Sequence, residues 1–147
     1  MYEEQMAEAI ISFIEEEGYT PLVQIPHLSG TIDFIGMNSN ECIIIESKIS
    51  KWKSALKQAV RYGYGAEKTF VALPTPTAEY VAKNFRQIFE KYGIGLIQVD
   101  ENNTDVLIEC KQNTPSPVFK KIITFEVEQR LEKSKDRIGK FIRRVNE

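Results

Sequence analysis

Hydrophobic and polar positions along the chain predict alternating helices and strands. Met6, Ile10 and Phe13 recur at helical spacing near the N-terminus, and Gly18 follows as a natural helix stop. The apolar run at 43–45 is typical of a central strand that is buried on both faces. The predicted elements, in chain order, are a helix over 3–17, strands over 19–25, 31–37 and 42–49, a helix over 52–62, a strand over 69–73, a helix over 78–92, strands over 94–99 and 106–110, and a helix over about 124–146.

The order of these elements predicts an α/β protein. Three strands in succession indicate an antiparallel meander, and the later strand–helix–strand alternation indicates parallel pairing through right-handed crossovers. We therefore expect a mixed central sheet flanked by helices, formed by residues 1–113. Pro21 favours an edge strand, and 26–30 is predicted to be a loop. A Thr-Pro-Ser-Pro linker then opens the segment 114–147, which contains the C-terminal helix.

The C-terminal helix carries an interrupted heptad pattern. Its apolar spacing alternates between four and three residues, with a serine as the flaw, at Val127, Leu131, Ser134, Ile138, Phe141 and Val145. Residues 111–147 carry ten basic and five acidic side chains, whereas residues 1–30 carry six acidic ones and none that is basic. Packing of this helix on its own domain is the simpler interpretation, and an arm that contacts phosphates or a second copy of the chain is the alternative.

Composition and length narrow the class of protein. The 147 residues are 42% hydrophobic and 27% charged, which suits a single globular domain. The sequence contains no apolar run of membrane-spanning length and no basic region typical of a secretory signal, so we expect a cytoplasmic protein without a membrane partner. Cys42 and Cys110 are expected to be two buried thiols. The sequence lacks a glycine-rich phosphate loop, so we expect no nucleotide cofactor.

Candidate chemistry lies on the second and third predicted strands. Glu46 and Lys48 stand two residues apart, so both side chains should emerge on one face. A carboxylate and an ammonium in an isoleucine-rich strand are costly to bury unless they are paired or bind a ligand. Asp33 would approach Glu46 if the two strands form a hairpin, and two carboxylates beside a lysine can bind Mg²⁺. An ordinary surface ion pair is the alternative, which the apolar strand disfavours.

The surroundings of these residues resemble the PD-(D/E)XK nuclease superfamily. The strings GTIDFI at 30–35 and IIIESK at 43–48 are similar to its core motif. The predicted order α-β-β-β-α-β matches its restriction-endonuclease-like core. Gln58 and Tyr62 resemble the Gln-x-x-x-Tyr motif of the exonuclease-like branch. The resemblance covers about residues 3–100 and excludes the C-terminal helix.

The resemblance implies roles for individual residues. Asp33 and Glu46 would bind Mg²⁺ or Mn²⁺ together with the backbone carbonyl of Ser47, and Lys48 would act on the attacking water. The sequence departs from the motif at Ile32, where many members of the superfamily have proline. Many members also vary at this position, so the departure leaves the assignment in place.

Several further residues are candidates for the site, and each also has a simpler structural explanation. Gln58 and Tyr62 would line the site, or form an ordinary solvated helix flank. Glu8 would be an additional acidic ligand from the first helix, although its helical phase places it opposite the apolar stripe. Trp52 and Tyr64 can stack on bases, although Trp52 is more simply the core anchor of its helix. His27 is expected to be a surface residue. Candidate phosphate contacts, or equally a solvated helix face, are Lys51, Lys53, Lys57 and Arg61.

The sequence thus favours a magnesium- or manganese-dependent deoxyribonuclease. We expect an endonuclease rather than an exonuclease, acting in DNA repair, recombination or restriction, with DNA as its partner and a homodimer as one arrangement. A catalytically inactive nucleic-acid-binding or assembly module of the same fold is the alternative. A third hypothesis is an interaction protein that works through the basic C-terminal helix.

Overall fold

The computed structural model describes residues 3–28 and 30–146, and it describes their side chains as far as residue 134. The helices are α1 (Glu3–Glu16), α2 (Trp52–Tyr62), α3 (Thr75–Tyr92) and α4 (Pro117–Asn146), with a short 3-10 helix η1 (Gly63–Gly65) after α2. The strands are β1 (Thr20–His27), β2 (Gly30–Met37), β3 (Cys42–Ser47), β4 (Lys68–Pro74), β5 (Gly95–Asp100) and β6 (Asn103–Ile108).

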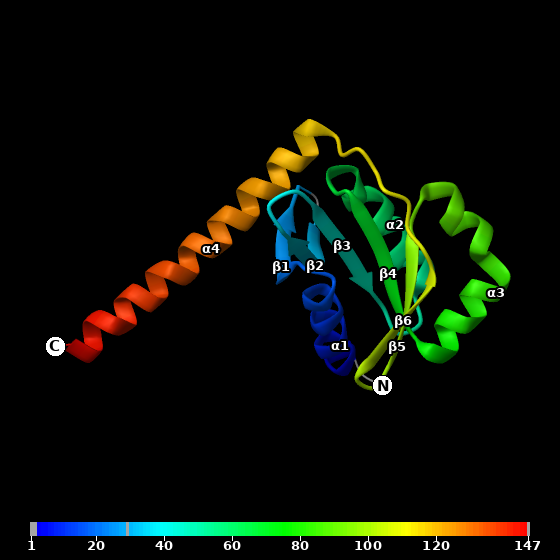
Figure 1. Ribbon diagram of the computed structural model, residues 1–147, viewed down its shortest axis with the longest axis horizontal. Coiled ribbons are helices and arrows are strands. Elements are labelled where there is room, and N and C mark those ends of the chain that lie inside the picture. Colours follow the sequence, from blue (N-terminus) through cyan, green and yellow to red (C-terminus); the bar gives the residue numbers. More distant parts are fainter. Residues whose placement is uncertain (1–2, 29, 147) are drawn as a thin grey trace.

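The strands form one six-stranded mixed sheet in the order β1-β2-β3-β4-β5-β6 (Figure 1). The first three strands form an antiparallel meander. The strands β3, β4 and β5 are parallel to one another, and β6 returns antiparallel to β5. The predicted α/β class and mixed sheet are confirmed, including the change from antiparallel to parallel pairing at β3.

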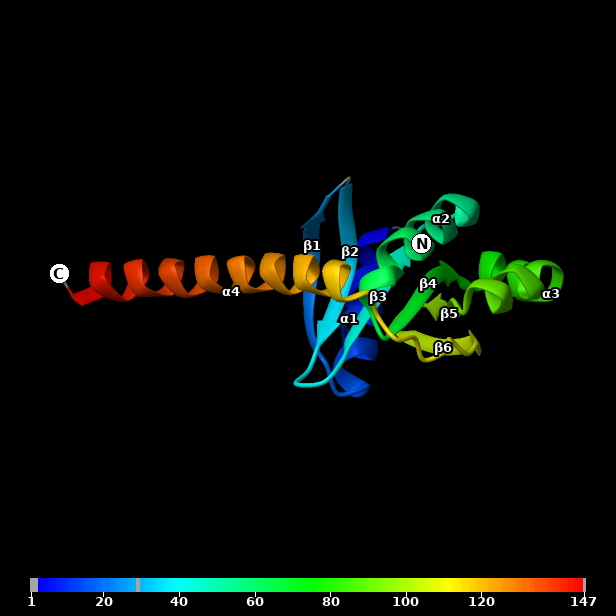
Figure 2. The same cartoon turned by 90° about the horizontal axis from the view of Figure 1, so that it is seen from above.

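Helices cover both faces of the sheet. Met6, Ile10 and Ile14 of α1 pack with alternate residues of β2 to β5 on one face. The helices α2 and α3 pack on the opposite face, which Figure 2 shows from above. Both of these helices connect neighbouring parallel strands, and successive right-handed crossovers in one direction place their helices on the same side. The side chains of β3 therefore point alternately toward α1 and toward α2.

The strand β3 lies in the centre of this arrangement. Each of its six residues is buried, as the apolar run at 43–45 predicts. Its end differs from the prediction, because the strand stops at Ser47 rather than Ile49. The predicted loop at 26–30 is also mostly strand, since β1 continues to His27 and pairs with Gly30. Proline is tolerated there because β1 is an edge strand.

The helix α4 begins at Pro117, well before the predicted start at about 124. Proline is favoured at the first helical position because its missing N–H has no helical partner there. Ile123 and Val127 are buried, and Arg130 donates hydrogen bonds to the carbonyls of Val23 (2.8 Å) and Gln24 (2.6 Å) of β1. The first half of α4 therefore packs on its own domain, as the simpler interpretation predicts.

The second half of α4 runs away from the body of the protein (Figures 1 and 2). Leu131, the next apolar position of the heptad pattern, is 44% exposed. The side chains of Ile138, Phe141 and Val145 lie outside the described residues. Within the described part of the chain, no helix combines the length and hydropathy of a membrane span.

Candidate metal centre

Asp33 and Glu46 face each other across β2 and β3. The register pairs Phe34 with Ile45, and Asp33 and Glu46 are the next residues of the two strands beyond that pair. The backbone N–H of Asp33 donates to Oε1 of Glu46 at 3.1 Å. The backbone N–H of Ser47 donates to Oδ2 of Asp33 at 3.1 Å. These crossed hydrogen bonds hold together the two carboxyl groups that the motif predicts to be neighbours.

The pair lies on the face of the sheet that α2 covers. Ile35 and Ile44 pack with Tyr62 of α2, and each stands two residues from one member of the pair. Strand alternation therefore directs Asp33 and Glu46 to the same side. Glu46 is completely buried, whereas Asp33 is half-buried at the rim. The site is thus a buried carboxyl group that is reached past a partly exposed one.

Burial and the neighbouring charge of Asp33 control the protonation of Glu46. Burial raises the pKa of Glu46 to about 9, and the neighbouring charge and side-chain hydrogen bonding of Asp33 add to this rise. The backbone hydrogen bond from Asp33 and the charge of Lys48 lower the same pKa by smaller amounts. Without a cation, Glu46 therefore retains its proton at neutral pH.

The donor atoms fit a divalent cation. Oε2 of Glu46 is buried and has no hydrogen-bond partner within the described residues. Such an orphaned carboxylate oxygen, beside a second carboxylate, is a ligand set of the kind that Mg²⁺ prefers. Asp33 and Glu46 would hold the cation, with the carbonyl of Ser47 as the third protein ligand that the motif implies. No third acidic, histidine or cysteine side chain among the described residues joins them.

Lys48 follows directly after β3 at the edge of this pair. Its backbone N–H donates to the carbonyl of Ala72 at 3.3 Å, a hydrogen bond of the last β3–β4 pair, Ser47 with Ala72. The side chain is half-buried. Its charge lowers the pKa of Glu46, so the ammonium lies within electrostatic reach of the carboxyl pair.

Tyr62 of α2 lies within electrostatic reach of Asp33 and Glu46. Its side chain is 2% exposed, and its hydroxyl lies 2.5 Å from the position that a Cβ on Gly30 would take. Burial and the charge of Glu46 raise the pKa of Tyr62, while Arg61 and a backbone hydrogen bond with Thr31 lower it. Gln58 is half-buried one helical turn earlier.

Glu8 is not brought to this site. It is exposed on α1, which covers the opposite face of the sheet. It lines a hollow of about 800 Å³ with Glu4, Asp100 and Glu101 instead. The helical phase of Glu8, opposite the apolar stripe, is the signal in the sequence that agrees with this position.

His27 is not the free surface residue expected from the sequence. Its ring lies between Tyr62 (centroids 5.0 Å apart) and Phe119 of α4 (6.2 Å, stacked). Both ring nitrogens are buried without a hydrogen-bond partner within the described residues. Burial and the charge of Arg61 lower the pKa of His27, and Glu126 opposes them, so His27 acts as a neutral aromatic spacer between α2 and α4 at neutral pH.

The basic residues after the motif lie on the outer surface of α2. Lys53, Lys57 and Arg61 follow at intervals of four residues, which aligns them along one helix face. They are exposed, as is Lys51 at the start of the helix. The charge of Arg61 lowers the pKa values of Tyr62 and His27, so one end of this basic face lies near these two aromatic rings.

Comparisons with known proteins give the fold alone. No family model matches the chain, and no curated protein matches its sequence. Among solved structures, a protein of unknown function from Silicibacter pomeroyi is similar, with a TM-score of 0.68 and 17% sequence identity. The match covers 92% of this chain and 92% of that chain. The architecture is therefore shared by another protein over nearly its whole length.

Proposed function

We propose that this chain is a magnesium- or manganese-dependent deoxyribonuclease with a restriction-endonuclease-like core, and that it cleaves phosphodiester bonds as an endonuclease. The observation that carries the proposal is the buried, unpartnered Oε2 of Glu46 beside Asp33. A buried carboxyl group with a pKa of about 9 is costly for folding unless it has a ligand to bind.

A divalent cation at this pair would polarise the scissile phosphate and lower the pKa of a nearby water. The residues of the chain prepare the site for it. The N–H groups of Asp33 and Ser47 fix the two carboxyl groups, so their oxygens are oriented before substrate arrives. Lys48 orients the attacking water and stabilises negative charge that develops on the phosphate.

The basic face of α2 supplies affinity for DNA. Lys53, Lys57 and Arg61 form a row along the exposed face of α2, and exposed cations in a row attract a phosphate backbone. Gln58 and Tyr62 lie between that row and the sheet. The row therefore guides a strand toward the site, while Tyr62 contributes to its inner wall.

The proposal is tested with the full chain on linear, circular, single-stranded and branched DNA, each with Mg²⁺ or Mn²⁺. We expect cleavage by the native protein, loss of cleavage in Glu46→Gln, and a loss of about 100-fold in Lys48→Ala. Glu67→Gln is the matched control, because Glu67 is the other buried glutamate among the described residues and lies outside the site.

The outcomes separate the two main hypotheses. Cleavage that Glu46→Gln abolishes and Glu67→Gln retains supports the nuclease. DNA binding without cleavage of any substrate supports the inactive nucleic-acid-binding or assembly module instead. Cleavage that all variants share would indicate a contaminating activity and remove the support for this site.

A further inference from the structure

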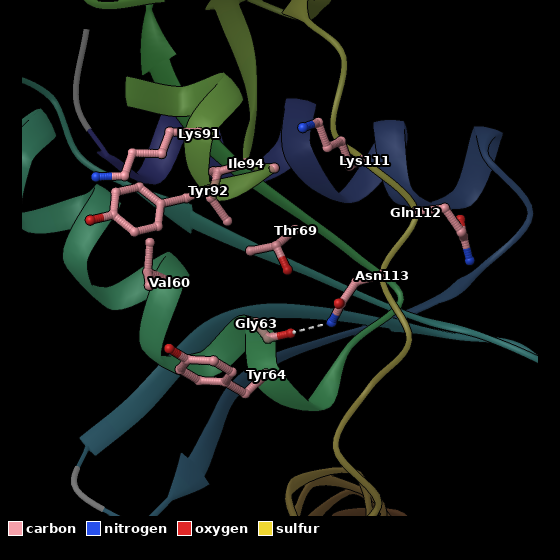
Figure 3. A pocket seen from close by; sticks show the side chains of 11 residues that line it. Val60, Gly63, Tyr64, Thr69, Lys91, Tyr92, Ile94, Lys111, Gln112 and Asn113 are labelled. Atoms are coloured by element: carbon pink, nitrogen blue, oxygen red, sulfur yellow. Dashed lines mark hydrogen bonds between the residues drawn. The ribbon is translucent and has the colours of Figure 1, made fainter. Parts of the chain in front are cut away.

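A cavity lies on the flank of α2 that faces away from the carboxyl pair. It has a volume of about 290 Å³ and opens between the end of α2 with η1, the end of α3, and the segment that follows β6 (Figure 3). Thr69, at the start of β4, and Val60 of α2 form part of its lining. None of the candidate catalytic residues lines this cavity.

Two tyrosines border the cavity with exposed rings. Tyr64 of η1 is 57% exposed and Tyr92 at the end of α3 is 49% exposed. Figure 3 shows the two rings on the same side of the opening, with Val60 between them. Exposed aromatic rings beside an apolar wall provide surfaces on which flat rings stack, and every nucleic-acid base has such a ring.

Two lysines supply the charge of the cavity. The ammonium of Lys91 lies 5.4 Å from the ring centroid of Tyr92, and Lys111 lines the cavity from the segment after β6. Among the described residues, neither lysine forms an ion pair. Aromatic rings and uncompensated ammonium groups together match a nucleotide, which presents a flat base and a negative phosphate.

Hydrogen bonds to backbone carbonyl groups hold the walls of the cavity. The N–H of Lys111 donates to the carbonyl of Gly93 at 3.0 Å, and the side-chain amide of Asn113 donates to the carbonyls of Gly63 (3.4 Å) and Ala66 (3.1 Å). These bonds join the segment after β6 to the ends of α2 and α3. The cavity walls are therefore fixed before a ligand binds.

We propose that this cavity binds a nucleotide of a single-stranded nucleic acid, with its base on Tyr64 or Tyr92 and its phosphates at Lys91 and Lys111. Val60 of α2 lines the cavity, Tyr62 of α2 lies within electrostatic reach of the carboxyl pair, and the basic residues are exposed on the same helix, so one strand can cross α2 and reach both sites. The inference rests on the proposed function for the biological role of that strand. Binding itself does not require cleavage.

The test measures binding of a short fluorescent single-stranded oligonucleotide to the full chain in a metal chelator, where cleavage does not occur. We expect at least one of Tyr64→Ala and Tyr92→Ala to weaken binding about fivefold or more, and the variant that does so identifies the ring on which the base stacks. We expect Lys111→Gln to reduce the dependence of log affinity on log salt by about 0.7, because one phosphate contact is lost. The tyrosine variants should retain the native salt dependence.

Matched controls come from α3, the helix that carries Lys91 and Tyr92. Tyr80→Ala removes a tyrosine that is 55% exposed and lies outside the cavity, and Lys83→Gln removes an exposed lysine. Neither control should change binding. Unchanged affinity in both cavity tyrosine variants, or an equal loss in Tyr80→Ala, would overturn the inference. An equal loss for a fully paired duplex would also overturn it, because duplex bases are already stacked.

DNA and RNA oligonucleotides are compared in parallel, and the strand for which the tyrosine variants lose affinity is the one that the cavity takes. Failure of the two proposals is distinguishable. Weaker binding by the tyrosine variants, with no cleavage by the native protein, would support the nucleotide-binding cavity and contradict the nuclease proposal. Cleavage by the native protein together with unchanged binding in the tyrosine variants would support the nuclease and contradict the nucleotide-binding cavity.

Discussion

The backbone N–H of Asp33 donates a 3.1 Å hydrogen bond to the carboxyl group of Glu46 across β2 and β3. This contact fixes one carboxyl oxygen of Glu46 and leaves the other buried without a partner among the described residues. The arrangement resists ionisation of Glu46 in the absence of a cation and favours it in the presence of one. Protonation, stability and cation binding are therefore coupled at a single residue.

The pH dependence of stability should show this coupling. The pKa of Glu46 is raised from its usual 4.5 to about 9, so the folded state holds a proton that the unfolded state has lost. Its stabilising contribution is complete below about pH 4.5 and declines as the pH rises through 9, at up to about 1.4 kcal/mol per pH unit. Urea unfolding from pH 5 to 9, without divalent cations, measures this decline.

Glu46→Gln is the control for that measurement, since glutamine has nearly the same volume and does not titrate. We expect its unfolding free energy to fall less steeply with pH than that of the native chain. Mg²⁺ or Mn²⁺ should flatten the native profile, because a cation stabilises the ionised carboxylate. Parallel profiles for native protein and variant would contradict the raised pKa of Glu46.

Gly30 and Tyr62 should show strong energetic coupling. A Cβ on residue 30 would lie 2.5 Å from the Tyr62 hydroxyl oxygen but 3.8 Å from the ring carbon that carries it. We expect Gly30→Ala to cost about 1–3 kcal/mol of unfolding free energy in the native background. In Tyr62→Phe the same substitution should cost at least about 1 kcal/mol less. Equal costs in the two backgrounds would show that the hydroxyl does not occupy this position.

Lys120 and Glu67 join α4 to the body of the protein. The ammonium of Lys120 lies 2.8 Å from Oε2 of Glu67, whose other oxygen accepts the backbone N–H of Cys42 at 2.8 Å. Glu67 is buried but Lys120 is 39% exposed, so solvent screens part of the interaction. We expect Lys120→Met to lower the unfolding free energy by about 1–2 kcal/mol.

The neighbouring Lys121→Met is the matched control for that substitution. Lys121 is exposed on the same helix turn and forms no ion pair among the described residues. Its replacement should change the unfolding free energy by less than about 0.5 kcal/mol. If both substitutions had the same cost, loss of general helix charge would explain the result better than loss of the contact with Glu67.

Much of the fold follows from periodicity in the sequence. The bounds of α2 agree with the prediction, because an amphipathic stripe and the following glycines mark both ends. The approach of Asp33 to Glu46 follows from strand alternation and a hairpin register. The predicted start of α4 at about 124 is too late. The first turns pack through Ile123 while Val118 and Phe125 are exposed, so the apolar pattern there is weak.

Contacts between distant segments could not be predicted in this way. The ring of His27 is enclosed because α4 returns to β1 and places Phe119 against it, a contact across 92 residues that local patterns do not carry. The cavity beside Tyr64 depends in the same way on three separated segments. Lys91, Tyr92 and Lys111 form no motif in the sequence, and only the fold brings Lys111 to the neighbouring Lys91 and Tyr92.

The central claim is that Asp33 and Glu46 form a divalent cation site, and calorimetric titration of Mn²⁺ into the full chain at pH 7 tests it most directly. Titrations in buffers of different ionisation enthalpy also count the protons that binding releases. We expect one site that releases about one proton, because Glu46 with a pKa of about 9 must ionise to bind. Glu46→Gln should abolish that site. Absence of binding, or binding that Glu46→Gln leaves unchanged, would contradict the account.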